Sequence, residues 1–231
     1  SDHDVVLVER DELTSGTTWH SAAQVRALRH SRNLTRMIRY SSNVEATRML
    51  NRIGKQRLLE ILQSEEFQLY DPEVHGGLWV GKEYGKSAAY QRDPLYNLSH
   101  GATAMQVARF YYLLETENLV TPRYSREMKK VLADTRLRHK FVKVLERINP
   151  AALLFRKSGS WRTHHSDSVL AERDGRGYIA VALSEGAEGS RWLREIIEVL
   201  DRFAADVPGA AYASVAVAVL DGSTTVRLAV A

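Results

Sequence analysis

The sequence has 231 residues, of which 44% are hydrophobic and 26% are charged, a composition that supports an ordinary folded core. It contains no cysteine, which excludes disulfide bonds, cysteine-based zinc sites and thiol nucleophiles. The formal net charge of +4 does not by itself indicate nucleic-acid binding, and no apolar run reaches the roughly 18 residues that a membrane-spanning helix needs.

The first elements are a short strand and a polar loop. Residues 4–9 (DVVLVE) form a β-branched apolar run with polar ends, which predicts a buried strand, and residues 14–21 predict a loop. The polar, acidic first residues lead directly into that strand, so we expect no signal peptide in this chain.

Residues 22–52 show a mostly helical pattern with an expected break at residues 40–43. Nine Lys and Arg residues lie between positions 26 and 57, accompanied by a single acidic residue, Glu45. Such a run is typical of a solvated helix face. Too few aromatic residues are interleaved with it to support a surface that follows nucleic-acid phosphates.

Further helices are expected at residues 55–64, 103–114, 125–133 and 135–148. The segment 70–100 between them is irregular and rich in Gly, Tyr and His, which is typical of a packed or functional loop.

Strands and one more helix are expected in the C-terminal part. Two strand-like segments flank residues 173–176 (RDGR), a hairpin signal, and Ser190 is expected to cap a helix with an apolar stripe from Trp192 to Phe203. After residue 206, VPGAA and then ASVAVAVL-DG-STTVRLAVA predict a second hairpin. We expect residues 215–220 to pair with the edge of the sheet that contains residues 153–158.

Residues 155–162 (FRKSGSWR) place a lysine, a glycine and two small hydroxyls on a strand-like segment. Gly159 allows a ligand to approach the backbone closely, and Lys157 offers it a positive charge. Together with Ser158 and Ser160, these residues predict a binding strand for an anionic group.

The stretch Lys157–Ser160 resembles the K-[ST]-G-[ST] element of the penicillin-recognising serine hydrolases, the class A β-lactamases and penicillin-binding proteins. Residues 40–54 (YSSNVEATRMLNRIG) resemble the family's S-x-N element at the head of a helix, with Ser41 and Asn43 in the motif positions. Taken alone, these two residues are better explained as an ordinary helix cap, but their order with the lysine motif favours the family. The resemblance spans residues 40–203, about 70% of the chain.

The resemblance implies an α/β fold, in stricter terms α+β: an antiparallel sheet packed by helices plus an all-helical lobe, N-terminally incomplete, with the site in the cleft between them. It implies acyl transfer or amide hydrolysis on β-lactams or peptide-like substrates that bear a carboxylate, as in bacterial antibiotic resistance.

The same resemblance assigns roles to the motif residues. Lys157 and the hydroxyls of Ser158 and Ser160 would bind the substrate carboxylate, and strand backbone beyond Gly159 would supply an oxyanion donor. In the other motif, the Ser41 hydroxyl would pass a proton to the leaving nitrogen, and the Asn43 amide would orient the substrate amide.

Two parts of the family pattern are missing. Its nucleophile is the serine of S-x-x-K, and no serine in this chain is followed by lysine three positions later. For the deacylating glutamate, Glu83 and Asp93 lie in the right loop but outside the family's E-x-x-L-N pattern. We therefore expect a truncated hydrolase whose activity is in question, with the nucleophile unassigned.

Residues 4–26 (DVVLVERDELTSGTTWHSAAQVR) resemble the flavin-binding start of sarcosine/dimethylglycine dehydrogenase-type oxidoreductases, as far as about residue 40. This resemblance implies that Glu9 binds the adenosine ribose of FAD and that Trp19 and His20 lie beside the isoalloxazine, with His20 as the attachment point. The glycine fingerprint that precedes the strand's carboxylate in such proteins is not in this sequence. FAD is therefore a cofactor only under this alternative.

We expect three segments: residues 1–40 as the flavoprotein-like remnant, 41–205 as the β-lactamase-like serine hydrolase domain, and 206–231 as a linker and hairpin. The expected partner is a small molecule bearing a carboxylate, with no nucleic acid, membrane, cofactor or metal. His164 and His165 are adjacent on a strand and point to opposite faces, so we expect no shared metal. Besides the flavoprotein fragment, a non-catalytic ligand-binding domain remains an alternative. The location would be periplasmic or secreted for a full-length hydrolase and cytoplasmic otherwise, and the oligomeric state is open.

Overall fold

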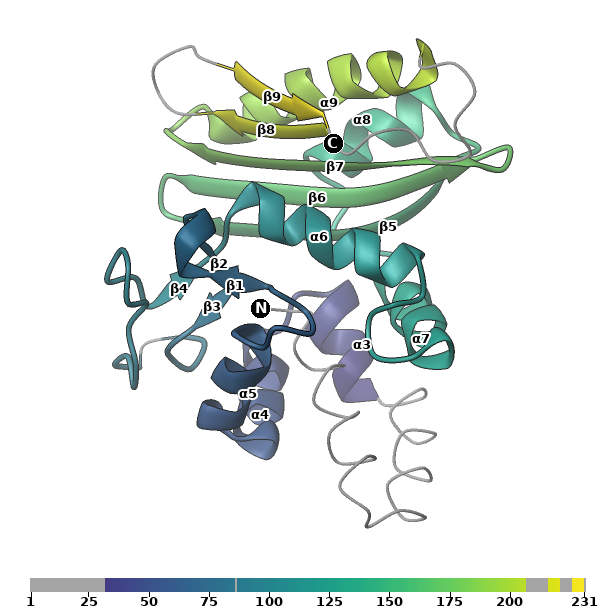
Figure 1. Ribbon diagram of the computed structural model, residues 1–231. Coiled ribbons are helices and arrows are strands. Elements are labelled where there is room, and N and C mark those ends of the chain that lie inside the picture. The colour runs from purple at the N-terminus through teal and green to yellow at the C-terminus, as the bar shows by residue number, and fades with distance from the viewer. Residues whose placement is uncertain (1–31, 86, 207–215, 221–225, 231) are drawn as a thin grey trace. The chain divides into compact units, whose positions relative to one another are not determined.

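The computed structural model describes residues 32–85, 87–206, 216–220 and 226–230 (Figure 1). The chain divides into two compact units, Ser1–Val131 and Leu132–Ala231. The strand and loop expected before residue 22, with Glu9, Trp19 and His20, lie outside the described residues. Within the described ranges, the helices lack the combination of length and apolarity that a bilayer crossing requires.

The described part of the first unit begins with the helices α3 (Arg32–Arg39), α4 (Asn43–Ile53) and α5 (Lys55–Leu62). The break expected at residues 40–43 is confirmed, because it separates α3 from α4. The Ser42 side chain caps α4 by accepting a hydrogen bond from the Glu45 N–H at 3.4 Å. Gly54, with φ 95°, ends α4 and donates its N–H to the Leu50 carbonyl.

The segment expected to be an irregular loop contains two small antiparallel sheets. Strand β1 (Tyr70–Asp71) pairs with β2 (Gly76–Gly77) around the short helix η1 (Pro72–Val74), and β3 (Trp79–Val80) pairs with β4 (His100–Gly101). The backbones approach closely next to β3, where a Cβ on Gly81 would lie 1.8 Å from the Gln91 carbonyl oxygen. Helices α6 (Ala104–Glu115) and α7 (Pro122–Leu132) follow, so the unit is mainly helical.

The second unit is built on one sheet with the strand order β5-β6-β7-β8-β9 (Figure 1). Strands β5 (Leu153–Trp161), β6 (His164–Arg173) and β7 (Arg176–Glu185) pair antiparallel. The predicted hairpin at residues 173–176 is confirmed. Its two central residues, Asp174 and Gly175, both have positive φ, as a tight two-residue hairpin turn requires.

The tail completes this sheet. Strands β8 (Ala216–Leu220) and β9 (Val226–Val230) form the predicted hairpin, and β8 pairs with β7, which confirms the expected contact with the sheet edge for residues 216–220. The β7–β8 pairing is parallel, unlike the other pairings in the sheet. Helix α9 (Gly189–Asp206) explains this direction, because it carries the chain back along the sheet before β8 begins.

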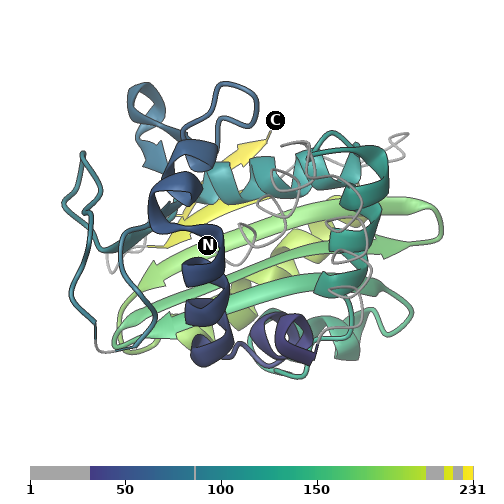
Figure 2. The ribbon, with the colours of Figure 1, turned by 90° about the horizontal axis from the view of Figure 1, so that it is seen from below.

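Helix α8 (Phe141–Ile148) and helix α9 pack on one face of the sheet, and α9 is seen behind the strands in Figure 2. The apolar stripe predicted for α9 is confirmed at Leu193, Ile196, Ile197 and Leu200, whereas Phe203 at its end is 45% exposed. These side chains form one core with residues of α8 and with alternating residues of β6 and β7. The α8 residues are Phe141, Val144 and Leu145, and the strand residues are Val169, Ala171, Tyr178, Ala180 and Ala182.

Two sequence-based boundaries are wrong. The helix expected at residues 135–148 begins only at Phe141, because Lys140 before it has φ 51° and ψ −119°, which no helix accommodates. Ser190 is not a cap, since α9 begins at Gly189 and its first hydrogen bonds run to the Glu188 carbonyl. The segment boundaries expected at residues 40 and 205 stay a prediction.

Candidate functional site

The lysine motif lies on β5, which ends the strand order of its sheet. Lys157 and Ser158 are buried, each 7% exposed, whereas Gly159 and Ser160 are exposed. The motif therefore runs from the interior of the unit to an accessible strand end.

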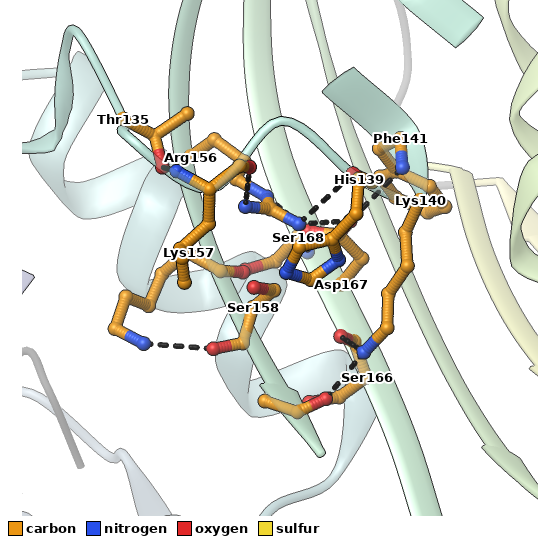
Figure 3. A network of polar contacts seen from close by, with 12 residues as sticks. Thr135, His139, Lys140, Phe141, Arg156, Lys157, Ser158, Ser166, Asp167 and Ser168 are labelled. Atoms are coloured by element: carbon orange, nitrogen blue, oxygen red, sulfur yellow. Dashed lines mark hydrogen bonds and ion pairs between the residues drawn. The ribbon is translucent and has the colours of Figure 1, made fainter. Parts of the chain in front are cut away.

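Neighbouring motif side chains leave β5 on opposite faces, as in any strand. Ser158 and Ser160 share one face, and Lys157 and Gly159 share the other. The Lys157 ammonium donates a hydrogen bond to the Ser158 carbonyl at 2.7 Å (Figure 3). That Lys157 acts jointly with the hydroxyls of Ser158 and Ser160 stays a prediction.

A second lysine, Lys140, contacts the face that carries the hydroxyls (Figure 3). Its Nζ donates to the Ser160 Oγ at 2.8 Å, to the Gly159 carbonyl at 2.5 Å and to the Ser166 carbonyl at 3.0 Å. The residue is only 2% exposed. Burial lowers the pKa of Lys140 to about 8, and the charge of Asp167 opposes this shift. The sequence did not identify Lys140 as a site residue, because it lies just before a helix in a segment that matches no motif.

A buried ion pair fixes the backbone that carries Lys140. The Arg156 guanidinium, 1% exposed, donates to both oxygens of Asp167, at 2.6 Å and 2.7 Å. It also donates to the carbonyls of Leu137 and His139, and Asp167 accepts from the Phe141 N–H at 3.0 Å. These bonds clamp residues 137–141 against β5 and so direct the Lys140 side chain to the strand end (Figure 3).

Ionisation in this network is shifted by burial. Burial raises the pKa of Asp167, and the charge of Arg156 opposes the rise. Burial lowers the pKa of His139 to about 4, and the charges of Arg156 and Lys140 act in the same direction. His139 is therefore neutral at pH 7, and the positive charge of the network resides on the lysines and Arg156.

The S-x-N motif lies in the first unit, at the break before α4. Ser42, rather than Ser41 or Asn43, supplies the helix cap, so the cap explanation does not account for the two motif residues. Ser41 is half-buried with φ 55°, and Asn43 is exposed at the first position of α4. That Ser41 and Asn43 act with Lys157 stays a prediction.

The two carboxylates considered for the deacylating role, Glu83 and Asp93, both have hydrogen-bonding or ion-pair partners. Glu83 forms an ion pair with Lys55 at 2.7 Å, and this contact lowers the pKa of Glu83. Asp93 is buried and accepts hydrogen bonds from the Tyr70 hydroxyl and, at 2.6 Å, from the Tyr96 N–H. Burial raises the pKa of Tyr70, and its hydrogen bond to Asp93 acts in the same direction. These contacts hold both carboxylates in the loop, and the deacylating residue stays unassigned.

His164 and His165 take part in separate contacts. The His164 ring stacks on Trp161 with centroids 5.6 Å apart, whereas His165 Nδ1 lies 3.5 Å from the Ser160 Oγ. In the part of the chain that the structure describes, no group of three or more His, Asp or Glu side chains is arranged to hold a metal.

Comparison with known proteins yields a family match and several structural neighbours. Residues 1–207 match the family described as "Beta-lactamase enzyme family". No curated protein matches the sequence. The family match includes the residues that resemble flavoproteins, and the FAD alternative gains no support from it.

The structural neighbours have similar folds at low sequence identity. A representative of class A β-lactamase from Bacteroides cellulosilyticus DSM 14838 has a TM-score of 0.60 and 15% identity, over 89% of this chain and 82% of that one. A β-lactamase from Sphaerobacter thermophilus DSM 20745 has a TM-score of 0.57 and 12% identity, over 77% and 64% of the chains. PBP-A has a TM-score of 0.53 and 12% identity, over 75% and 60%. The chain therefore spans less than two thirds of the length of the last two, and the likeness concerns the fold.

Proposed function

Because the chain belongs to the β-lactamase enzyme family, we propose that it recognises the carboxylate of β-lactams or peptide-like substrates and acts in acyl transfer or amide hydrolysis. The observation that carries the proposal is the K-S-G-S motif on the edge strand β5. Its Gly159–Ser160 end is exposed, and the buried lysines Lys140 and Lys157 lie next to that end.

The chemistry of this strand end suits an anion. Ser160 offers an exposed hydroxyl, and Gly159 has no side chain to obstruct the backbone. Lys140 and Lys157 place two positive charges close to the same short segment. Hydrogen bonds to a carboxylate in such a field are stronger than those between neutral groups. A carboxylate-bearing ligand therefore fits the segment better than a neutral one.

The roles of the other motif residues belong to the same proposal. The Ser41 hydroxyl is proposed to protonate the leaving nitrogen, and the Asn43 amide is proposed to orient the substrate amide. Acylation also requires a nucleophile, and the S-x-x-K pattern assigns none in these 231 residues. Ligand binding and turnover are therefore separate parts of the proposal and need separate measurements.

The test combines calorimetric titration with benzylpenicillin, intact-protein mass spectrometry for an acyl adduct, and a chromogenic cephalosporin for turnover. We expect saturable binding that Lys157→Ala weakens about tenfold, which corresponds to the loss of one charge-assisted hydrogen bond. Lys143→Ala is the matched control, because Lys143 is an exposed lysine of the same unit.

The three readouts separate the possible functions. An adduct or a colour change that Ser41→Ala or Asn43→Ala slows would support acyl transfer. Binding without either signal would favour the non-catalytic ligand-binding alternative. If benzylpenicillin does not bind at all, the proposed function is wrong.

A further inference from the structure

Lys140 is bound in a way that determines the hydrogen-bonding role of Ser160. An ammonium group has three N–H donors and no acceptor. The three acceptors of Lys140 are the carbonyls of Gly159 and Ser166 and the Oγ of Ser160. In the Lys140–Ser160 contact at 2.8 Å, the hydroxyl oxygen must therefore accept.

The hydroxyl hydrogen of Ser160 is then available to another acceptor. Within hydrogen-bond range, the described contacts offer only His165 Nδ1, at the outer limit of 3.5 Å. Burial lowers the pKa of His165, as do the charges of Lys140 and His164. Because Ser160 is exposed, an oxygen of a bound ligand can replace this long contact with a shorter one.

We propose that Lys140 is a positioning residue that holds the Ser160 hydroxyl as a hydrogen-bond donor toward the carboxylate of the bound substrate. This inference rests on the proposed function and extends it to a residue outside both motifs. Lys140 acts through Ser160, because its own amine is buried and its three donors are used. The clamp of Arg156 and Asp167 on residues 137–141 fixes the backbone from which Lys140 reaches the strand.

A double-mutant cycle tests this coupling in the full chain. Lys140→Met, Ser160→Ala and the double variant are titrated with benzylpenicillin and with its methyl ester, which lacks the charged carboxylate. We expect each single change to weaken benzylpenicillin binding about tenfold, the usual value of a charge-assisted hydrogen bond. The double variant should bind benzylpenicillin no more weakly than Ser160→Ala does. The affinity for the methyl ester should fall by less than about twofold in each variant.

A merely structural role of Lys140 gives a different pattern. In that case Lys140→Met would weaken the binding of benzylpenicillin and of its methyl ester equally. Its loss of binding affinity would also add to the loss caused by Ser160→Ala. Either result overturns the inference, and the proposed function stands if benzylpenicillin still binds and Lys157→Ala still weakens that binding about tenfold. Urea unfolding of each variant shows whether a loss of binding reflects a loss of folded protein.

A readout without ligand keeps the inference testable even if benzylpenicillin does not bind. The pKa of the Lys140 amine is followed by nitrogen-15 NMR in the wild type and in Ser160→Ala, an exposed position that tolerates the change. Removing an acceptor of the ammonium should lower this pKa further, because the charged form loses a hydrogen bond. The charged and titratable neighbours are the same in both proteins: His139, Arg156, Lys157, His165 and Asp167. An unchanged or raised pKa would show that the hydroxyl does not accept from Lys140.

Discussion

Removing the cation of the buried Arg156–Asp167 pair should strongly destabilise the second unit. Arg156→Met leaves the Asp167 carboxylate fully buried, with the Phe141 and Ser168 N–H groups at 3.0 Å as its remaining donors. Breaking such a pair from one side costs about 3–5 kcal/mol, because the surviving charge has no partner. This is a large share of the roughly 5–15 kcal/mol that holds a typical domain folded.

The measurement is urea unfolding followed by far-UV circular dichroism at pH 8. Arg156→Met combined with Asp167→Asn is the informative control, since the amide removes the unpaired charge and keeps an acceptor for the backbone. We expect the double variant to be more stable than Arg156→Met alone by about 1–3 kcal/mol.

The loss of stability in Arg156→Met should also depend on pH. Burial raises the pKa of Asp167, and without Arg156 only the Phe141 N–H bond and the charge of Lys140 still oppose that rise. The folded variant then binds a proton more tightly than the unfolded chain, so its stability increases as the pH falls from 8 to 5. The reasoning is refuted if Arg156→Met costs less than about 1 kcal/mol, or if the double variant is the less stable of the two.

Three further outcomes follow from the described geometry. Ser42→Ala should lower the free energy of unfolding by about 0.5–1 kcal/mol through loss of the α4 cap, whereas Asn43→Ala should change it little. Thermal melts that show equal effects of the two substitutions would contradict the capping role of Ser42. Gly81→Ala should cost about 3 kcal/mol or more, because its Cβ would lie 1.8 Å from a carbonyl oxygen, whereas Gly85→Ala, in open space at φ 106°, should cost about 1–2 kcal/mol in urea unfolding. The pKa of Lys140, about 8 in the fold against 10.5 for a free lysine, means that the unfolded chain binds more protons between these values. Wild-type stability relative to Lys140→Met should therefore rise from pH 8 to 9.5, and a flat difference between their unfolding curves would speak against the shift.

The elements predicted correctly are those specified by nearby residues. The Asp174–Gly175 turn has the residue types that a tight hairpin needs, and the spacing of Leu193, Ile196 and Leu200 defines the buried face of α9. Both signals are local, so they can be recognised before any tertiary contact is known.

The errors arise where distant residues determine the backbone. Residues 135–140 have a helical pattern, but the carbonyls of Leu137 and His139 bond to Arg156, which is 19 and 17 positions away. Lys140 could not be identified for the same reason, since its acceptors lie 19, 20 and 26 positions further along the chain. The K-S-G-S motif is recognisable by composition, whereas the residue that contacts its last hydroxyl depends on the folded backbone.

The parallel β7–β8 pairing has a consequence for biosynthesis. Strand β7 pairs with β6 as soon as the hairpin leaves the ribosome, but its other neighbour is made only after the whole of α9. During translation of about 30 intervening residues, one edge of the apolar strand IAVAL has no partner strand. The sheet therefore reaches its final strand order only after the C-terminal hairpin has been made.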